Sequence, residues 1–128
     1  KLKYIKKWTD SRISHAIKYN DLLSNTEVIV PVSHPKAKHV FHLYVIRLPN
    51  RDDLYNFLIQ NNISCGIHYP VALPFLEAYS YLNHKAEDFP VANKLTKEIL
   101  SLPIYPELNV PQFNYISKVV NNYFKMKK

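Results

Sequence analysis

The residues most suited to a functional site lie almost next to one another: Gly66, His68 and Tyr69. Gly66 is the only glycine in the chain, and a glycine within a strand marks a bulge or a close approach by a ligand or another backbone. As a β-strand, residues 63–70 would place Gly66 and His68 on one face and Tyr69 on the other. One interpretation is a strand end that presents His68 and Tyr69 to a group lying over Gly66. The alternative, favoured by the residues alone, is a bulged strand whose histidine is simply hydrogen-bonded.

Other residue types give weaker chemical signals. His34, His39 and His42 suggest a metal site, but a strand places positions 39 and 42 on opposite faces, so no metal site is predicted. Cys65 is the only cysteine, which excludes an internal disulfide, favours the reducing cytoplasm and suggests a small buried hydrophobe. A single glycine also excludes a glycine-rich phosphate-binding loop.

The composition predicts one globular domain that binds neither membranes nor nucleic acids. The chain has 128 residues, of which 47% are apolar, and no apolar run approaches the ~20 residues that cross a bilayer. The formal charge of +7 comes largely from lysines near the two termini. Because RNP-like motifs, zinc-finger spacings and arginine-rich strips are absent from the sequence, these lysines are interpreted as solvated ends.

The elements that position these residues follow from hydrophobic periodicity. The fold class expected is α/β: a mainly antiparallel sheet of about three strands, flanked on one side by helices. Residues 1–128 form a single domain, with a leading helix at 1–24, a small α/β domain at 25–124 and a basic tail at 125–128. The pattern predicts helices at 2–23, 50–61, 89–100 and 110–124 and strands at 39–48 and 63–70, and it is compatible with a short edge strand at 27–30.

Local signals mark the ends and faces of the helices. The apolar stripe of helix 2–23 is wide for so short a chain, so part of it is expected to pack against protein outside this chain. Arg12 lies on the same stripe, where its guanidinium is expected to reach a carbonyl or carboxylate. Asn50 is expected to cap the second helix and Asn62 to end it in a left-handed conformation, and Asn109 starts the last helix.

Six short motifs, taken in order, carry a resemblance that no single one would support. They are Arg12 with Ala16, Tyr19 and Leu23; His42 to Arg47 followed by Arg51-Asp52; Gly66-Ile67-His68-Tyr69-Pro70; Ala78-Tyr79; Asp88 to Ala92; and Leu100 to Pro106. In this combination the chain resembles, over about Lys1 to Phe124, the C-terminal domain of the DegT/DnrJ/StrS sugar aminotransferases. These are pyridoxal-phosphate (PLP) enzymes of the aspartate-aminotransferase fold. Family members often carry a second proline and a second histidine soon after the His-Tyr-Pro element, where this chain has Ala72 and Pro74, and this departure leaves the substrate subclass undetermined.

The resemblance implies that this chain holds one part of an enzyme. In the family the Schiff-base lysine, the aspartate at the pyridine nitrogen and the phosphate-binding loop lie upstream, so no residue here is expected to be catalytic or to bind the cofactor. His68 and Tyr69 are the expected substrate-binding residues. The implied partners are a large PLP domain, a nucleotide-linked sugar and, for the parent enzyme, a second copy in a homodimer. Pyridoxal phosphate is implied for the full-length enzyme only.

Two functional hypotheses follow. The first is the C-terminal domain or a fragment of a nucleotide-sugar aminotransferase, inactive by itself, and the absence of an initial methionine fits this hypothesis. The second is a stand-alone, non-catalytic module that binds a sugar nucleotide or a protein partner.

Overall fold

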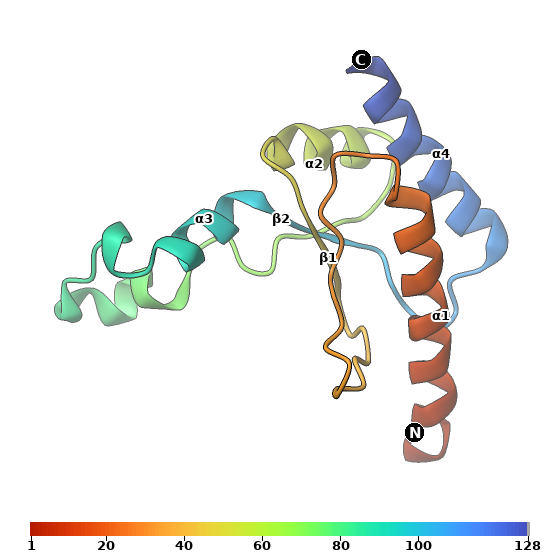
Figure 1. Cartoon of the computed structure of the whole chain (residues 1–128), viewed down its shortest axis with the longest axis horizontal. Coiled ribbons are helices and arrows are strands. Elements are labelled where there is room, and N and C mark those ends of the chain that lie inside the picture. Colours follow the sequence, from red (N-terminus) through yellow and green to blue (C-terminus); the bar gives the residue numbers. More distant parts are fainter. Residues whose placement is uncertain (128) are drawn as a thin grey trace.

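The computed structural model describes residues 1–127 and divides them between a packed body and a projecting arm (Figure 1). The helices of the body are α1 (Ile5–Leu23), α2 (Arg51–Gln60) and α4 (Val110–Met126), and its strands are β1 (Tyr44–Arg47) and β2 (Ile99–Leu102). The arm carries α3 (Pro90–Glu98) and the 3₁₀ turns η2 (Leu73–Phe75), η3 (Glu77–Leu82) and η4 (Ala86–Asp88), and a further 3₁₀ turn, η1 (Leu2–Tyr4), precedes α1.

The sheet is small and antiparallel, as predicted, but β1 is shorter than the strand expected at 39–48, and β2 was not predicted as a strand. β1 and β2 pair with Tyr44 opposite Leu102 and Arg47 opposite Ile99. Isolated bridges extend this pairing on each side, from Ile29 to Arg47 and from Gly66 to Ser101. The α/β class is therefore confirmed, with two strands in the described chain rather than about three.

Two predicted strands are corrected by the structure. The strand predicted at 39–48 is reduced to 44–47, because Phe41 takes a positive φ of 47° that interrupts the extended backbone. The strand predicted at 63–70 pairs only at Gly66. Beyond Gly66 the His68 side chain folds back and bonds to Ser101, and the backbone leaves the sheet.

Two of the three asparagine signals are confirmed by their hydrogen bonds. Asn62 has a φ of 56°, and the amides of Asn62 and Ile63 close the end of α2 on the Ile59 and Leu58 carbonyls at 3.0 and 2.9 Å. Asn109 accepts a hydrogen bond from the Gln112 amide at 2.9 Å and caps α4.

Asn50, by contrast, takes the cap position of α2 but makes no side-chain cap hydrogen bond. The position of the cap was therefore predicted correctly, but not its chemistry.

The core lies where α1, α2 and α4 meet the sheet. Tyr19 and Tyr44 stack with ring centroids 4.8 Å apart, and the Tyr19 hydroxyl donates to the Pro103 carbonyl at 2.8 Å. The other fully buried side chains are aliphatic: Ala16, Leu23, Ile46, Leu54, Leu58, Leu100 and Val120. The body is thus held by one continuous cluster beneath the two strands.

Helix α1 buries apolar side chains only in its second half. Tyr19 and Leu23 are inside, whereas Leu2 (83% exposed) and Ile5 at the start of the predicted stripe face solvent. Arg12 donates from Nε to the Val40 carbonyl at 3.3 Å, which ties α1 to the segment before β1 as expected.

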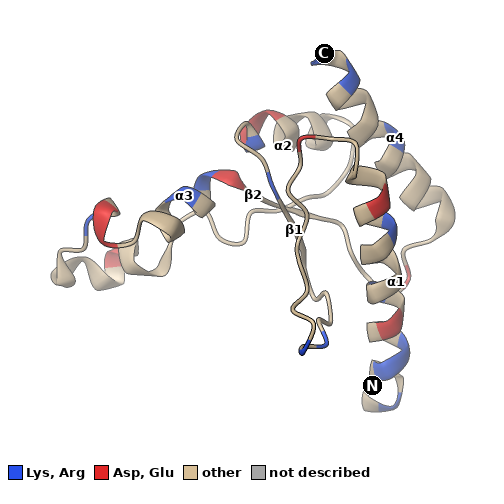
Figure 2. Cartoon of the chain, in the orientation of Figure 1, with Lys and Arg blue, Asp and Glu red and all other residues tan. Residues whose placement is uncertain are grey.

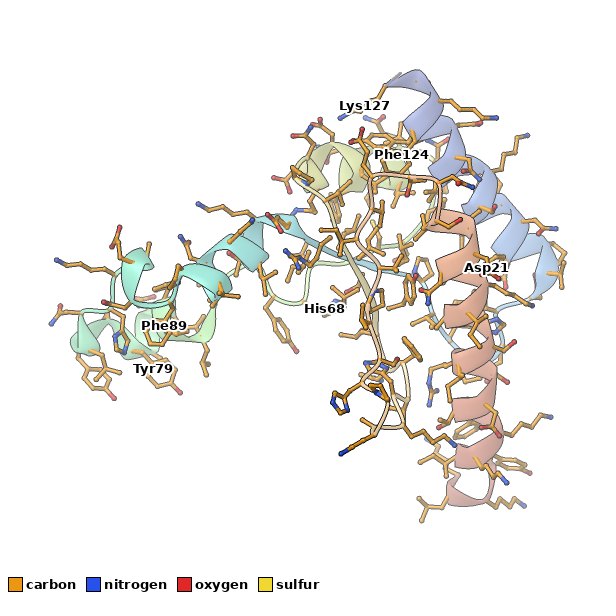
Figure 3. The ribbon with its side chains drawn as sticks, in the orientation of Figure 1. Asp21, His68, Tyr79, Phe89, Phe124 and Lys127 are labelled. Atoms are coloured by element: carbon orange, nitrogen blue, oxygen red, sulfur yellow. The ribbon has the colours of Figure 1, made fainter. Side chains whose placement is uncertain are left out.

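The arm contributes no buried side chain to the core. From residue 64 to residue 99 no side chain is buried, although the segment is rich in aromatic and aliphatic residues. Tyr79 and Phe89 lie on this arm, away from the body (Figure 3). Helix α3 ends at Glu98 rather than Leu100, and its Val91 side chain is 70% exposed.

Basic side chains lie on both the body and the arm. Figure 2 shows the lysines and arginines along α1 and α4, in the loop before β1, on β1, at the start of α2 and on the arm with α3. Within residues 1–127 no helix combines the length and the apolar character needed to span a bilayer. The described part of the basic tail continues α4 to Met126, and Lys128 lies outside the described residues.

Candidate functional site

The candidate site is built on the bridge between Gly66 and Ser101. The Gly66 amide donates to the Ser101 carbonyl at 3.1 Å, and the Ser101 amide donates back to the Gly66 carbonyl at 2.7 Å. Gly66 follows α2 and Ser101 lies within β2, so residues 35 positions apart share one pair of hydrogen bonds. This bridge fixes the backbone from which His68 projects.

The His68 imidazole lies directly over Gly66. A Cβ added at position 66 would come within 2.8 Å of His68 Cε1, so only glycine leaves room for the ring in this position. The ring is held there by a 2.9 Å hydrogen bond between Nδ1 and the Ser101 hydroxyl. The group over Gly66 is therefore the protein's own histidine, which is hydrogen-bonded as the interpretation favoured by the residues alone expects.

A shallow pocket of about 370 Å³ opens beside this unit. Gly66, His68 and Ser101 contribute to its wall together with Leu43, Ser64, Cys65, Leu102, Pro103 and Ile104. His68 is exposed at its rim, so the hydrogen-bonded histidine is still accessible from solvent (Figure 3). The pocket thus combines an apolar wall with one accessible imidazole.

Tyr69 lies beside the pocket rather than in its wall. Its side chain is 72% exposed, and its ring meets the His68 ring edge-on at 5.7 Å between centroids. The structure therefore brings His68 and Tyr69 together at one surface, with His68 at the pocket and Tyr69 at its outer margin.

Cys65 lines the same pocket but is not arranged as a nucleophile. Burial raises the pKa of its thiol from 9.0 to about 11, so the thiolate is scarce at neutral pH. The side chain is half-buried and packs against the hydrophobic core. Its setting is that of a small hydrophobe.

Ser101 was missed as a site residue by sequence reasoning. It lies in the Leu100 to Pro106 motif, where no sequence signal marks it as a site residue. Its hydroxyl becomes significant only because the bridge places it opposite Gly66, and no sequence periodicity reports that pairing.

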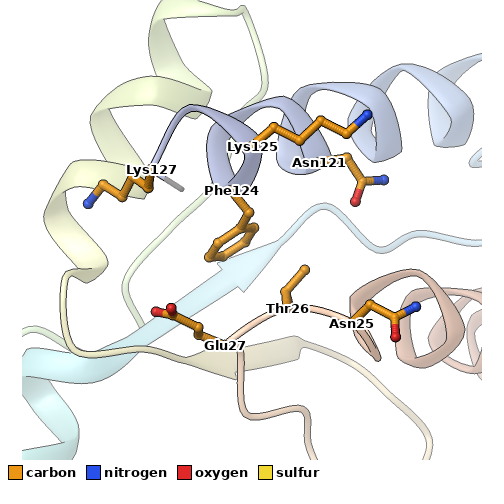
Figure 4. A pocket seen from close by; sticks show the side chains of 7 residues that line it. All are labelled: Asn25, Thr26, Glu27, Asn121, Phe124, Lys125 and Lys127. Atoms are coloured by element: carbon orange, nitrogen blue, oxygen red, sulfur yellow. The ribbon is translucent and has the colours of Figure 1, made fainter.

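A second hollow of about 430 Å³ lies between the segment after α1 and the end of α4 (Figure 4). Its lining residues are Asn25, Thr26, Glu27, Asn121, Phe124, Lys125 and Lys127. The Lys127 ammonium bonds outward to Asp53 at 2.9 Å. This hollow contains none of the residues predicted for the site.

Among residues 1–127 no lysine has the setting of a Schiff-base lysine. A Schiff-base lysine needs an enclosed or strongly charged setting that makes its amine reactive, and every lysine in residues 1–127 is exposed. Nor does any group of three or more His, Cys, Asp or Glu side chains within that range have the arrangement of a metal site.

The chain matches proteins of one family over most of its length. Residues 1–121 match the DegT/DnrJ/EryC1/StrS aminotransferase family. A pleiotropic regulatory protein of Geobacillus stearothermophilus is 34% identical over 128 residues, which cover 98% of this chain and 34% of the relative. The dTDP-3-amino-3,6-dideoxy-alpha-D-galactopyranose transaminase of Aneurinibacillus thermoaerophilus is 30% identical over 123 residues, which cover 96% of this chain and 33% of that enzyme.

The fold agrees with solved structures of the same group. The crystal structure of S. venezuelae DesV in complex with a ketimine intermediate superposes with a TM-score of 0.91 at 29% identity, covering 95% of this chain and 33% of DesV. The chain thus spans about a third of the length of the relatives it matches. By sequence and by fold, the chain belongs to the DegT/DnrJ/EryC1/StrS aminotransferase family.

Proposed function

We propose that this chain supplies the small domain of a nucleotide-sugar aminotransferase, in which the amine-transfer centre is carried by the remaining two-thirds of the enzyme. The observation that carries the proposal is the close superposition on one third of DesV. The names of the relatives, which include dTDP- and UDP-sugar transaminases, support the substrate class. The exposed setting of every described lysine supports a catalytic amine elsewhere.

The family's aminotransferases depend on PLP, which acts as an electron sink while an amine moves from donor to acceptor. This chain's part is to bind and orient the sugar nucleotide. His68, accessible at the pocket rim, offers a ring nitrogen to an oxygen of the ligand. Tyr69 offers an exposed ring and hydroxyl beside it. Both act by hydrogen bonding and contact, which place the sugar rather than change it chemically.

The bare apolar surfaces fit a docking role. The turn η1 before α1 and the arm expose large hydrophobic side chains, including Leu2, Tyr81 and Val91, and such surfaces commonly become interfaces. In the proposed enzyme the larger domain covers these surfaces. The pocket at His68 then becomes one wall of a closed cleft.

A chimera tests the proposal directly. The third of DesV that superposes on this chain is replaced by residues 1–128, and amine transfer from glutamate to a keto-sugar nucleotide is measured by product formation. We expect the chimera to be active and residues 1–128 alone to be inactive, even with PLP added. Turnover by residues 1–128 alone would contradict the proposal, as would a folded, cofactor-loaded chimera with no activity.

Binding measurements on the isolated chain distinguish a stand-alone binding module from the small domain of an aminotransferase. Calorimetric titration of residues 1–128 with dTDP- and UDP-sugars is compared between the wild type and His68→Ala. Tight binding that His68→Ala abolishes, without any gain in the chimera, would favour a module that acts by itself.

A further inference from the structure

The Ser101 hydroxyl has a single hydrogen-bond partner in the described chain, and that partner is His68 Nδ1 at 2.9 Å. Ser101 is 4% exposed. A buried hydroxyl carries one hydrogen to donate, and leaving that hydrogen without an acceptor is unfavourable. Within residues 1–127 the only acceptor offered to it is Nδ1.

This geometry decides the tautomer of the imidazole. If the Ser101 hydroxyl donates to Nδ1, then Nδ1 carries no proton and the neutral ring is protonated at Nε2. Nε2 has no hydrogen-bond partner within residues 1–127, and His68 is exposed at the rim of the pocket. The free N–H therefore remains available to a ligand.

We infer that Ser101 is a positioning residue, which orients the His68 ring over Gly66 and fixes its tautomer so that Nε2–H donates to an acceptor oxygen of the bound sugar nucleotide. This inference rests on the proposed function. It adds that the contact recognises an oxygen acceptor and rejects a donor at the same place. It also makes Gly66, His68 and Ser101 one unit, in which the glycine supplies the space, the serine the orientation and the histidine the contact.

The tautomer is measured first, on the unmodified chain. Long-range ¹H–¹⁵N correlation NMR of residues 1–128, at a pH of about 8.5 where histidine side chains are in general neutral, distinguishes protonated from unprotonated ring nitrogens. The His68 signals are identified by their loss in His68→Gln. We expect an unprotonated Nδ1 and a protonated Nε2. A ring protonated at Nδ1 would overturn the inference without any variant of Ser101.

The second measurement uses the active chimera with Ser101→Ala, Ser101→Thr and a control, Ser117→Ala. Ser117 is a partly buried serine of α4 with no side-chain hydrogen bond in the described chain. We expect Ser101→Ala to raise the KM for the sugar nucleotide about three- to tenfold, the loss expected when one hydrogen bond is misaligned, with kcat little changed. Ser101→Thr, which keeps a hydroxyl, should restore most of the KM, and Ser117→Ala should have no effect.

The outcomes separate this inference from the proposed function. If His68→Gln raises KM and Ser101→Ala does not, the histidine binds substrate but the serine does not position it, and the inference is wrong. Equal effects of Ser101→Ala and Ser117→Ala would also overturn it, because loss of any serine hydroxyl would then suffice. If neither His68→Gln nor Ser101→Ala changes KM in an active chimera, the site assignment fails and the inference fails with it, while amine transfer by the chimera still stands.

Discussion

Substitution of Gly66 should change the free energy of unfolding in one direction in the wild type and in the opposite direction when His68 is also substituted. Alanine fits the backbone at this position, because Gly66 has no positive φ. The alanine side chain, however, would clash with the imidazole, because its Cβ would lie 2.8 Å from His68 Cε1. In Gly66→Ala the imidazole must rotate away and release the Ser101 hydroxyl.

The magnitude follows from two opposing terms. Replacing glycine at a compatible backbone position stabilises a protein by about 0.4–1 kcal/mol through the unfolded chain. A buried hydroxyl left without its partner costs about 1–3 kcal/mol. Gly66→Ala should therefore lower the free energy of unfolding by up to about 2.5 kcal/mol. In a His68→Ala background the hydroxyl is already unpaired and the space is empty, so the same change should stabilise by about 0.4–1 kcal/mol.

The wild type, Gly66→Ala, His68→Ala and the double mutant form a double-mutant cycle. Urea denaturation followed by far-ultraviolet circular dichroism measures the free energy of unfolding of all four proteins. We expect a coupling energy of about 1–3 kcal/mol between positions 66 and 68. The reasoning is refuted if Gly66→Ala destabilises equally with and without His68. That result would mean that the glycine serves the bridge to Ser101 rather than the imidazole.

Three further predictions test the scaffold. Arg51→Met, which removes the buried guanidinium that bonds two carbonyls at the α3–β2 junction at 2.7 and 3.1 Å, should destabilise by about 2–4 kcal/mol in urea, and Arg51→Lys should recover less than half of the loss. Asn109→Ala should cost about 0.5–2 kcal/mol, whereas Asn50→Ala, without a cap hydrogen bond, should cost less than about 0.5; equal costs would contradict the capping geometry. The rate of Cys65 alkylation by iodoacetamide should follow a pH profile with its midpoint near 11, and a midpoint near 9.0 would show that the thiol is not buried. Because the thiol of the unfolded chain ionises first, the free energy of unfolding should fall as pH rises from 9.0 to about 11.

Local chemistry was predictable where it depends on neighbours in sequence. Asn62 ends α2 in the left-handed conformation, and Asn109 caps α4, because each needs only residues within one helical turn. The strand at 63–70 was wrong for the opposite reason. Alternating residues can form a ladder only where a partner strand runs beside them, and here the partner is available only at the bridge to Ser101.

The site shows the same division. The relation between Gly66 and His68 was visible in the sequence, since the two residues are two positions apart. What occupies the space over the glycine was not, because the ring is drawn back by a hydroxyl 33 residues further along the chain. Long-range partners of this kind leave no periodic signal.

The predicted helix 2–23 and α3 both have apolar faces that remain exposed, and the proposed function gives one physical explanation for the two. Hydrophobic periodicity records the environment of a residue in the complete protein, whatever portion of that protein is folded. Leu2 lies at the start of the stripe of the predicted helix 2–23, and Val91 lies on α3; both are exposed, at opposite parts of the molecule. A chain that spans a third of its relatives should show such mismatches where the other two-thirds pack against it. The residues at which burial disagrees with pattern therefore map the expected interface, and in the active chimera they should lose solvent exposure together, as measured by hydrogen exchange.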